Sequence, residues 1–404
     1  MERSILHMDL DTFFVSVERL LDSRLRDRPI LIGGSGDRGV VAACSYEARA
    51  FGVHSAMPMR MARELCPEAI VIHGNSATYS AHSQAVTEIV RQSVPVVEKA
   101  SVDEFYADLT GVDRFLGTYK MASELRSRIA LETGLPLSFG LSINKTVSKV
   151  ATGVAKPNNQ LRIASGEEKT FLAPLSVRKI PMVGEKMYQS LRNLGVQTIG
   201  TVQEMPVDLL QQVFGKPGKT LWEKAQGVDP TPVVPTQERK SISAERTFER
   251  DTLDAQKLEG LLTAMVENLC FQLRRGDKVT SEITLKIRYA DFETQTKQRK
   301  IPYTSADHVL IPLAKSLFRE LHNRRLMVRL VGVRFGGLVG GGMQFQLFEQ
   351  EARVHQLYEA LDAVRKKYGD RAVVRASGLH ARSIGGASNP FDGGPPMLLA
   401  RRRQ

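Results

Sequence analysis

A proline-rich stretch near the middle of the chain separates two different patterns of apolar residues. It reads Asp229-Pro230-Thr231-Pro232-Val233-Val234-Pro235-Thr236, a composition that favours a stiff, extended linker. The segments on its two sides must therefore fold around cores of their own. With 404 residues the chain has room for about two to four ordinary domains, and neither disulfides nor structural metals are needed to stabilise them.

The pattern after the linker is the more regular of the two. It predicts, in order, a strand near 242–249, a helix at 255–275, strands at 279–290 and 294–303, a helix at 308–325 and a strand at 327–336. This βαββαβ order is the ferredoxin-like motif. Three glycines at 340–342 predict a hairpin turn into a further strand at 343–347. A helix at 352–368 follows, and the Gly-, Pro- and Ser-rich segment 381–404 is expected to be disordered.

The pattern before the linker alternates short apolar runs with helical periods, which is typical of an α/β unit. A strand is expected at 5–8, and apolar positions from Phe13 to Leu25 then recur at helical spacing. Two further strands, at 94–99 and 105–109, flank a turn at 100–104. Another strand is expected at 137–142, and helices at 117–133 and 145–156. The segment 166–230 is predicted to be helical and broken by prolines and glycines.

The net charge of +12 and the pI near 9.6 favour a polyanionic partner, either nucleic acid or an anionic membrane surface. The three cysteines are too scattered for a disulfide framework or a zinc site, and the histidines lack metal-binding spacing. The N-terminus lacks a signal-peptide core, and no apolar run reaches the roughly 18 residues of a membrane span. We therefore expect a soluble cytoplasmic protein.

Two acidic pairs in apolar strand surroundings are the sharpest chemical signal. Asp9 and Asp11 follow the first strand at positions i and i+2, so their side chains can leave the same face. Asp103 and Glu104 are adjacent, and they can serve one site only on a turn or a bulge, which the hairpin at 100–104 provides. Grouped carboxylates repel one another unless a cation neutralises them, and oxygen ligands suit Mg²⁺ or Mn²⁺.

Two such ions can stabilise both the attacking and the leaving oxygen of a phosphoryl transfer, and nucleotidyl transfer fits this arrangement. The alternative is that an aspartate simply caps the following helix. That alternative suits Asp11, but applied to Asp9 it leaves the second acidic pair unexplained.

Five motifs in this order and spacing closely resemble those of the Y-family translesion DNA polymerases, in particular their bacterial members. They are Met8-Asp9-Leu10-Asp11-Thr12-Phe13-Phe14, Ser45-Tyr46-Glu47-Ala48-Arg49-Ala50-Phe51-Gly52-Val53, Ser101-Val102-Asp103-Glu104, Gly140-Leu141-Ser142-Ile143-Asn144-Lys145 and Ala155-Lys156-Pro157-Asn158. The resemblance covers about residues 4–350 and implies a multidomain α/β and α+β fold shaped like a right hand.

The resemblance also implies domain boundaries. A ferredoxin-like palm would comprise 1–10 and 74–165, with small fingers at 11–73. A thumb with a helix-hairpin-helix would span 166–230, a linker 231–241 and a βαββαβ little finger 242–349. The C-terminal helix and tail would occupy 350–404.

By resemblance, the metal-binding groups are Asp9, Asp103, Glu104 and the backbone carbonyl of Leu10, with Glu104 as the catalytic glutamate and Asp11 in a supporting role. The expected cofactor is a pair of Mg²⁺ ions, with Mn²⁺ as a substitute. The dNTP would meet Phe13, Phe14, Tyr46, Arg49 and Lys156. Phe14 would exclude a 2′-hydroxyl, and the last three would hold the triphosphate. From the residues alone, core packing for Phe14 and solvated charges for Arg49 and Lys156 remain alternatives.

The expected DNA contacts lie in the second half of the chain. In the thumb they are Val183, Gly184 and Lys186, where the family usually has glycine at the position of Met182. In and before the little finger they are Arg239, Lys240, Ser241, Ser243, Arg299 and Arg329. Eleven basic residues against four acidic ones between Lys286 and Arg334 favour a surface that follows the DNA backbone. Gln344, Leu347 and Phe348 resemble a sliding-clamp peptide, although the same residues also fit a final strand.

The function predicted from this resemblance is template-directed, low-fidelity DNA synthesis by a monomer, without a proofreading exonuclease. Its partners would be primer-template DNA, dNTPs and the sliding clamp, with no membrane involved. Two alternatives remain open from the sequence. One is a non-catalytic DNA-binding relative, and the other is a metal-dependent nuclease, because two-metal carboxylate sites also hydrolyse phosphodiesters.

Overall fold

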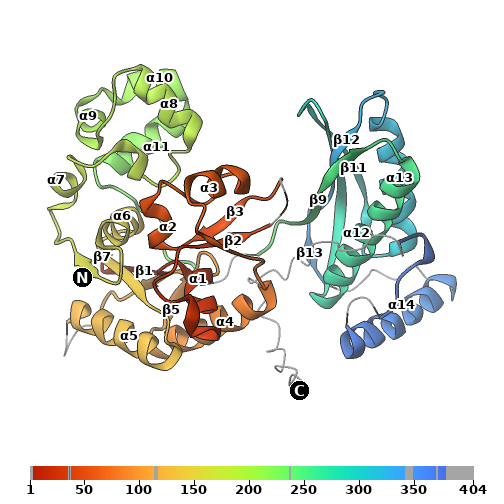
Figure 1. Cartoon of the computed structure of the whole chain (residues 1–404), viewed down its shortest axis with the longest axis horizontal. Coiled ribbons are helices and arrows are strands. Elements are labelled where there is room, and N and C mark those ends of the chain that lie inside the picture. The colour runs from red at the N-terminus through yellow and green to blue at the C-terminus, as the bar shows by residue number, and fades with distance from the viewer. Residues whose placement is uncertain are drawn as a thin grey trace. The chain divides into compact units, whose positions relative to one another are not determined.

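The computed structural model of the chain describes residues 3–34, 36, 38–112, 117–235, 238–341, 349–369 and 372–378. The described residues form two compact units, one ending in the proline-rich stretch and the other beginning at Glu238. Figure 1 shows the first unit with its sheets and helices labelled α1 to α11 and the second with those from β9 onward. In the part of the chain that is described, no helix is both long and apolar enough to cross a membrane.

A five-stranded sheet forms the centre of the first unit, with the strand order β5-β6-β1-β7-β8. Its strands are β1 (Ile5–Leu10), β5 (Val96–Lys99), β6 (Glu104–Asp108), β7 (Leu137–Ser142) and β8 (Gln160–Arg162). Strand β1 runs antiparallel to both of its neighbours, and only the β7–β8 pair is parallel. The first strand of the sequence is therefore the middle strand of the sheet, where both of its edges are hydrogen-bonded to neighbouring strands.

Helices cover both faces of this sheet. One set of alternate residues of β1 is apolar and packs against a first helix layer, and the other set faces a second helix layer. Leu6, Met8 and Leu10 pack in a core with helices α4 (Ser76–Ser93) and α5 (Thr118–Thr133). Helix α6 (Lys145–Ala155) packs on β7 and β1. Gly140 of β7 permits this close approach, since a Cβ atom there would lie 2.2 Å from the Ser148 carbonyl oxygen of α6.

A smaller sheet, with the order β3-β2-β4, follows the first strand and helix. Its elements are α1 (Phe13–Leu21), the 3₁₀ turn η1 (Ser23–Leu25), β2 (Ile30–Gly33), β3 (Val41–Cys44), α2 (Tyr46–Ala50), α3 (Met59–Leu65) and β4 (Ile70–Ile72). Helix α1 is shorter than the apolar pattern predicted. It ends because Asp22 is extended and its carboxylate accepts the Arg24 N–H at 3.0 Å, which starts η1.

The last part of the first unit is helical, as its sequence predicted, and its core includes residues of α6. The elements are α7 (Glu168–Leu172), η2 (Val177–Lys179), α8 (Glu185–Asn193), α9 (Ile199–Glu204), α10 (Val207–Phe214) and α11 (Lys216–Ala225). Because α6 shares this core, the helical part is packed directly onto a helix that also covers the five-stranded sheet.

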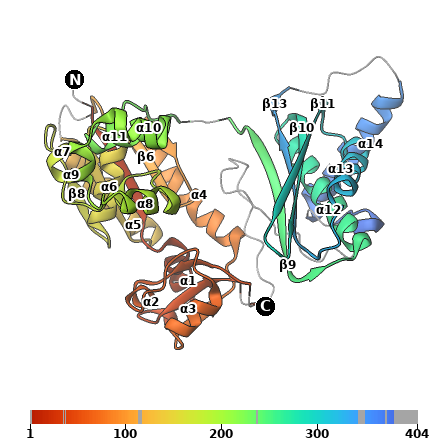
Figure 2. The ribbon, with the colours of Figure 1, turned by 90° about the horizontal axis from the view of Figure 1, so that it is seen from above.

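The second unit has the βαββαβ order that its sequence predicted. Its elements are β9 (Ser241–Thr252), α12 (Ala255–Arg275), β10 (Lys278–Tyr289), β11 (Thr294–Thr304), α13 (Asp307–Leu321), β12 (Val328–Gly336), β13 (Val339–Gly340), α14 (Glu349–Tyr368) and η3 (Ala376–Gly378). The sheet order is β11-β10-β12-β9, and α12 and α13 pack on one face of it (Figure 2). Helix α13 ends four residues earlier than predicted. Arg324, which was expected within this helix, follows it instead and pairs with Asp291 and Glu293 at 2.9 and 2.7 Å.

A buried ionic network holds helix α14 to this unit. The Arg274 guanidinium of α12 contacts Asp362 of α14 at 2.6 Å and Asp307 of α13 at 2.8 Å. Arg365 of α14 is 4 % exposed and lies 3.7 Å from Glu267 of α12. The strand expected at 343–347 and the tail expected at 381–404 lie outside the described residues.

Candidate active site

The predicted metal-binding carboxylates lie at the ends of two neighbouring strands of the five-stranded sheet. Asp9 of β1 stands directly opposite Glu104 of β6 in the antiparallel register. Residues paired in this way have Cα atoms about 5 Å apart, and their side chains leave the same face of the sheet. Asp103 precedes Glu104 in the β5–β6 turn, and the N–H of Leu10 donates to the Asp103 carbonyl at 3.0 Å. The structure therefore brings the two acidic segments together.

Ser101 organises the turn that carries Asp103 and Glu104. Its hydroxyl oxygen accepts the backbone N–H of Asp103 at 3.2 Å and that of Glu104 at 3.0 Å. The same hydroxyl donates to the Asp103 carboxylate. Because the Ser101 side chain holds the backbone of this turn, the two adjacent acidic residues can serve one site without a bulge in β6.

The carboxylates at this site are crowded and partly buried. Burial raises the pKa of Asp9 to about 7; attraction to Lys156 opposes the shift, and repulsion by Asp103 and Glu104 adds to it. The Nζ atom of Lys156 lies 2.6 Å from Asp9 Oδ1 and 3.3 Å from Asp11 Oδ1. An ammonium group thus supplies part of the positive charge that these carboxylates require.

Lys149 of α6 is a member of the site that the sequence interpretation missed. Its Nζ atom lies 2.7 Å from both carboxylate oxygens of Glu104. His7 adjoins this pair, with Nε2 4.0 Å from Glu104 Oε1 and Nδ1 2.8 Å from the Thr152 hydroxyl. Complete burial, followed by the charge of Lys149, lowers the pKa of His7 well below its usual value, so this imidazole is neutral. The available signal was a lysine in the middle of an otherwise small and apolar helix pattern.

Asp11 does not cap the following helix, so this alternative was wrong. Thr12 occupies the N-cap position of α1, and no side chain caps that end. The Asp11 side chain is 2 % exposed, and its Oδ2 accepts the Ser138 hydroxyl at 2.9 Å and the Asn158 N–H at 2.7 Å. Its Oδ1 accepts the Tyr46 hydroxyl at 3.2 Å. Asp11 therefore joins β1, β7, α2 and the loop after α6.

Two of the predicted triphosphate-binding residues, Tyr46 and Lys156, contact Asp11, and the third, Arg49, stacks on Tyr46. Tyr46 begins α2, whose N-cap Ser45 is fully buried and accepts the Ala48 N–H at 3.3 Å. The guanidinium of Arg49 lies over the Tyr46 ring, 5.1 Å from its centroid. Burial, followed by the charge of Asp11, raises the pKa of Tyr46, so its hydroxyl keeps its proton and can donate it to an anion.

Phe13 and Phe14 have different environments, although both were predicted to meet the nucleotide. The Phe13 ring is 3 % exposed and belongs to the core of the five-stranded sheet. It is therefore a packing residue, and its ring is not available to a ligand. Phe14 is half-buried and stacks on Tyr79 of α4, with ring centroids 4.3 Å apart. The second aromatic ring fixes the orientation of Phe14 at the edge of the core.

The donor set of this site fits a hard divalent cation. In the stretches that the structure describes, no three His, Cys, Asp or Glu side chains form a preassembled metal cluster. Lysine ammonium groups contact Asp9 and Glu104 instead. Oxygen-only ligands that repel one another and attract cations are what Mg²⁺ and Mn²⁺ require.

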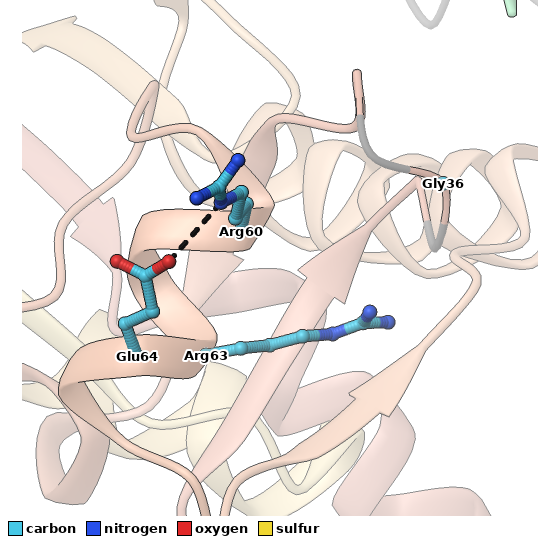
Figure 3. A pocket seen from close by; sticks show the side chains of 4 residues that line it. All are labelled: Gly36, Arg60, Arg63 and Glu64. Atoms are coloured by element: carbon cyan, nitrogen blue, oxygen red, sulfur yellow. Dashed lines mark hydrogen bonds and ion pairs between the residues drawn. The ribbon is translucent and has the colours of Figure 1, made fainter.

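A shallow pocket of about 240 Å³ lies elsewhere, against α3. It is lined by Gly36, Arg60, Arg63 and Glu64, and Arg60 pairs with Glu64 at 3.1 Å (Figure 3). The acidic residues of β1 and β6 do not line it.

The predicted DNA contacts of the helical segment lie before and within the first turn of α8. Gly184 is the N-cap of α8, and Lys186 is exposed in its first turn. The N–H groups of Val183 and Gly184 donate within the turn, to the Ile180 and Met182 carbonyls at 3.2 and 3.0 Å. Met182 has a φ of 82°, a conformation that favours glycine. The first turn of α8, whose amides lack helical partners, is thus the part that can receive a phosphate.

The second unit places its predicted contacts on different surfaces. Ser241 and Ser243 lie on the sheet face opposite α12 and α13, because Ser243 pairs with Arg334 while Ile242 pairs with the buried Phe335. Arg239 and Lys240 precede β9, and Lys240 is exposed.

Arg299 is an exception, since it pairs with the buried Ile283 and therefore faces the helix side. There it contacts Glu320 of α13 at 2.7 Å. Arg329 stacks on Phe292, 4.3 Å from the ring centroid. The helix-free face instead carries Lys286, Arg288, Lys300 and Arg334, which were counted among the eleven basic residues of the predicted DNA-following surface but were not singled out as contacts. The apolar core residues of β10 recur at every second position, and this period indicates that the basic residues between them lie on the opposite face. The clamp-like residues Gln344, Leu347 and Phe348 lie outside the described residues.

Comparisons with known proteins match this architecture over most of the chain. Family models match residues 8–153 (impB/mucB/samB family), 178–229 (DNA polymerase-iota, thumb domain) and 239–347 (impB/mucB/samB family C-terminal domain). DNA polymerase IV of Dehalococcoides mccartyi strain BAV1 is 40% identical over 375 residues, which cover 92% of this chain and 96% of the relative. DNA polymerase IV of Halorhodospira halophila is 38% identical over 339 residues, which cover 83% and 95%. A solved chimeric Y-family DNA polymerase matches with a TM-score of 0.76 at 25% identity, covering 84% of this chain and all of that one.

The fold and the carboxylate site define a DNA-directed DNA polymerase of right-hand architecture. The chain belongs to the Y family of DNA polymerases, and the relatives named DNA polymerase IV show that it is a translesion enzyme. It binds DNA and depends on a divalent metal, as this family does. Polymerase activity thus replaces the two alternatives of a non-catalytic relative and a nuclease.

Proposed function

We propose that Asp9, Asp103, Glu104 and the backbone carbonyl of Leu10 hold two Mg²⁺ ions, for which Mn²⁺ can substitute. The observation that carries this proposal is the cross-strand pairing of Asp9 with Glu104 beside the Asp103 turn. When bound, the ions would supply positive charge that offsets the negative charge developing on the attacking and leaving oxygens of a phosphoryl transfer. The primer 3′-hydroxyl would attack the α-phosphate of a dNTP, with release of pyrophosphate.

In this proposal the residues around Asp11 hold the triphosphate. Tyr46 and Arg49 start from the same short helix and present a hydroxyl and a guanidinium on one side. Lys156 presents an ammonium from the loop after α6, and it must leave Asp9 when a cation and the triphosphate enter. These three groups orient the dNTP, while Asp11 keeps them in place through its contacts with Tyr46 and Lys156.

Phe14 is proposed to select deoxynucleotides by its ring. Replacing it with alanine removes a ring that Tyr79 holds in place, and space opens for a 2′-hydroxyl. A steric clash of about 1–3 kcal/mol corresponds to roughly 10- to 100-fold discrimination, so we expect Phe14→Ala to lose about that factor. The measurement is the ratio of kcat/KM for a dNTP and the matching ribonucleotide. Phe14→Tyr is the control and should keep the ratio; an unchanged ratio in Phe14→Ala contradicts the role.

DNA would be held by the first turn of α8 and by the helix-free face of the second sheet. Val183, Gly184 and Lys186 supply the first surface, and Arg239, Lys240, Ser241 and Ser243 border the second, which Lys286, Arg288, Lys300 and Arg334 complete. Such contacts to phosphates position DNA without reading its sequence. Arg299 and Arg329 are also proposed to contact DNA, on the condition that they leave their present partners, Glu320 and Phe292.

The segment Gln344-Phe345-Gln346-Leu347-Phe348 is proposed to bind the sliding clamp, and the enzyme is proposed to act as a monomer. We expect deletion of residues 344–348 to abolish stimulation of synthesis by the clamp while basal primer extension keeps its rate. The measurement is processive extension with and without loaded clamp, alongside a thermal unfolding curve. A folded deletion variant that is still stimulated by the clamp contradicts the proposal, and an unfolded one favours the strand alternative.

A further inference from the structure

Three lysines of α6 and the loop after it pair with three acidic residues of the palm sheet. Lys145 contacts Glu98 of β5, Lys149 contacts Glu104 of β6 and Lys156 contacts Asp9 of β1. The proposed roles of Asp9 and Glu104 place the last two pairs at the active site. Lys156 is expected to exchange its carboxylate for the triphosphate, whereas Lys149 has no role in that account.

The backbone that carries Lys149 is fixed against the sheet on both sides of the residue. The Ser148 hydroxyl donates to the Ile5 carbonyl at 2.7 Å, and the Thr152 hydroxyl donates to the His7 carbonyl at 3.0 Å. Gly140 lets the helix come this close. Lys149 therefore starts from a rigid position, and its ammonium group reaches both oxygens of Glu104 at 2.7 Å.

This contact restrains a carboxylate that would otherwise turn away from its neighbours. Glu104 faces Asp9 across the strand pair and follows Asp103, so its charge is repelled by the neighbouring carboxyl groups when they are ionised. The Nε2 atom of the neutral His7 lies 4.0 Å from Glu104 Oε1 and has no hydrogen-bond partner. Lys149 is thus the group that both orients the Glu104 carboxylate and offsets the repulsion.

We infer that Lys149 is a positioning residue for nucleotidyl transfer, which holds the Glu104 carboxylate in the orientation that the primer end requires. The inference rests on the proposed role of Glu104. It does not require Lys149 to touch DNA, dNTP or metal. Its loss should therefore lower kcat while leaving the binding of both substrates unchanged.

Lys145 provides a matched control in the same helix. Its Nζ atom contacts both oxygens of Glu98 at 2.7 and 2.8 Å, with 13 % and 11 % exposure for the two side chains. The Lys149–Glu104 pair is more exposed, at 35 % and 23 %. A purely structural role would thus make the loss of Lys145 at least as harmful as the loss of Lys149.

The first experiment compares Lys149→Met, Lys149→Arg and Lys145→Met in single-nucleotide insertion. We expect Lys149→Met to lower kcat about 10- to 100-fold, with KM for dNTP and the dissociation constant for primer-template changed less than about twofold. Lys149→Arg should restore most of kcat. Lys145→Met should lower the melting temperature yet keep kcat. Equal loss of kcat in the two methionine variants, or a loss that appears only in KM, overturns the inference.

The second experiment repeats Lys149→Met in a Glu104→Ala background under single-turnover conditions. If Lys149 acts through Glu104, the second substitution has no further effect; if it acts on its own, the two losses multiply and the inference is wrong. A Glu104→Ala enzyme with wild-type kcat would instead refute the proposed role of Glu104. The two failures are therefore distinguishable.

Discussion

An Asp103→Ala enzyme is expected to lose primer extension by about a thousandfold or more and still bind primer-template with nearly wild-type affinity. Asp103 is proposed to be one of the groups that hold the ions, and the loss of about 4 kcal/mol of charge stabilisation in the transition state corresponds to that factor. The residue lies in the β5–β6 turn of the five-stranded sheet of the first unit, whereas the helix-free face that is proposed to hold DNA belongs to the second unit. Single-nucleotide insertion at saturating dNTP and Mg²⁺ measures the first quantity, and fluorescence anisotropy of labelled primer-template measures the second.

Asp108 is a suitable control, because it is an aspartate at the end of β6, the strand that follows the Asp103 turn. It pairs with Ile5 at the far end of β6, and its carboxylate accepts the Thr110 N–H at 2.9 Å. Asp108→Ala should cost some stability and leave the insertion rate nearly unchanged. The Asp103 substitution also removes one hydrogen bond from Ser101, so its fold must be verified by thermal unfolding. Wild-type insertion by a folded Asp103→Ala enzyme would show that the metal assignment is wrong.

The acidic site could be predicted because strand geometry is local. Two aspartates after a strand and an acidic pair in a hairpin turn are constrained by the two-residue period and by short connections. Neighbouring antiparallel strands then brought Asp9 and Glu104 face to face. The same reasoning predicted the order of elements in the second unit, where regular alternation marks each strand.

Contacts made across long sequence separations could not be predicted in this way. Lys149 lies 45 residues from Glu104, and the pairing depends on how closely α6 approaches the sheet at Gly140. Arg299 was counted as a DNA contact because of its charge, yet its register with Ile283 turns it toward α13. Charge is visible in a sequence, but the face on which a charge lies depends on strand register.

Asp11 shows the same limit, because a helix cap and a buried organising residue have the same sequence signature. Both place an aspartate just before a helix. The structure distinguishes them by burial, since the Asp11 side chain is 2 % exposed and accepts hydrogen bonds from three different segments. The difference has consequences that an experiment can separate.

An Asp11→Ala enzyme is expected to lose about 3 kcal/mol of unfolding free energy and to show a roughly tenfold higher KM for dNTP. The stability loss follows because the buried Ser138 hydroxyl and the partly buried Asn158 N–H remain as donors without their acceptor. KM rises because Tyr46 loses the oxygen that holds its hydroxyl, and Lys156 loses one of its two carboxylate neighbours. At saturating dNTP, kcat should fall much less, since Asp9, Asp103 and Glu104 are intact.

The matched control is Asp22, which does cap a local turn. Its carboxylate accepts the Arg24 N–H at 3.0 Å at the start of η1, directly after α1. Asp22→Ala should cause only a small loss of stability and no change in KM, which is the behaviour that a capping role predicts for Asp11 as well. Denaturant unfolding and steady-state insertion kinetics on both variants decide the matter. If Asp11→Ala behaves like Asp22→Ala, the triphosphate-binding groups do not depend on Asp11, and Tyr46 and Lys156 must be oriented by the nucleotide itself.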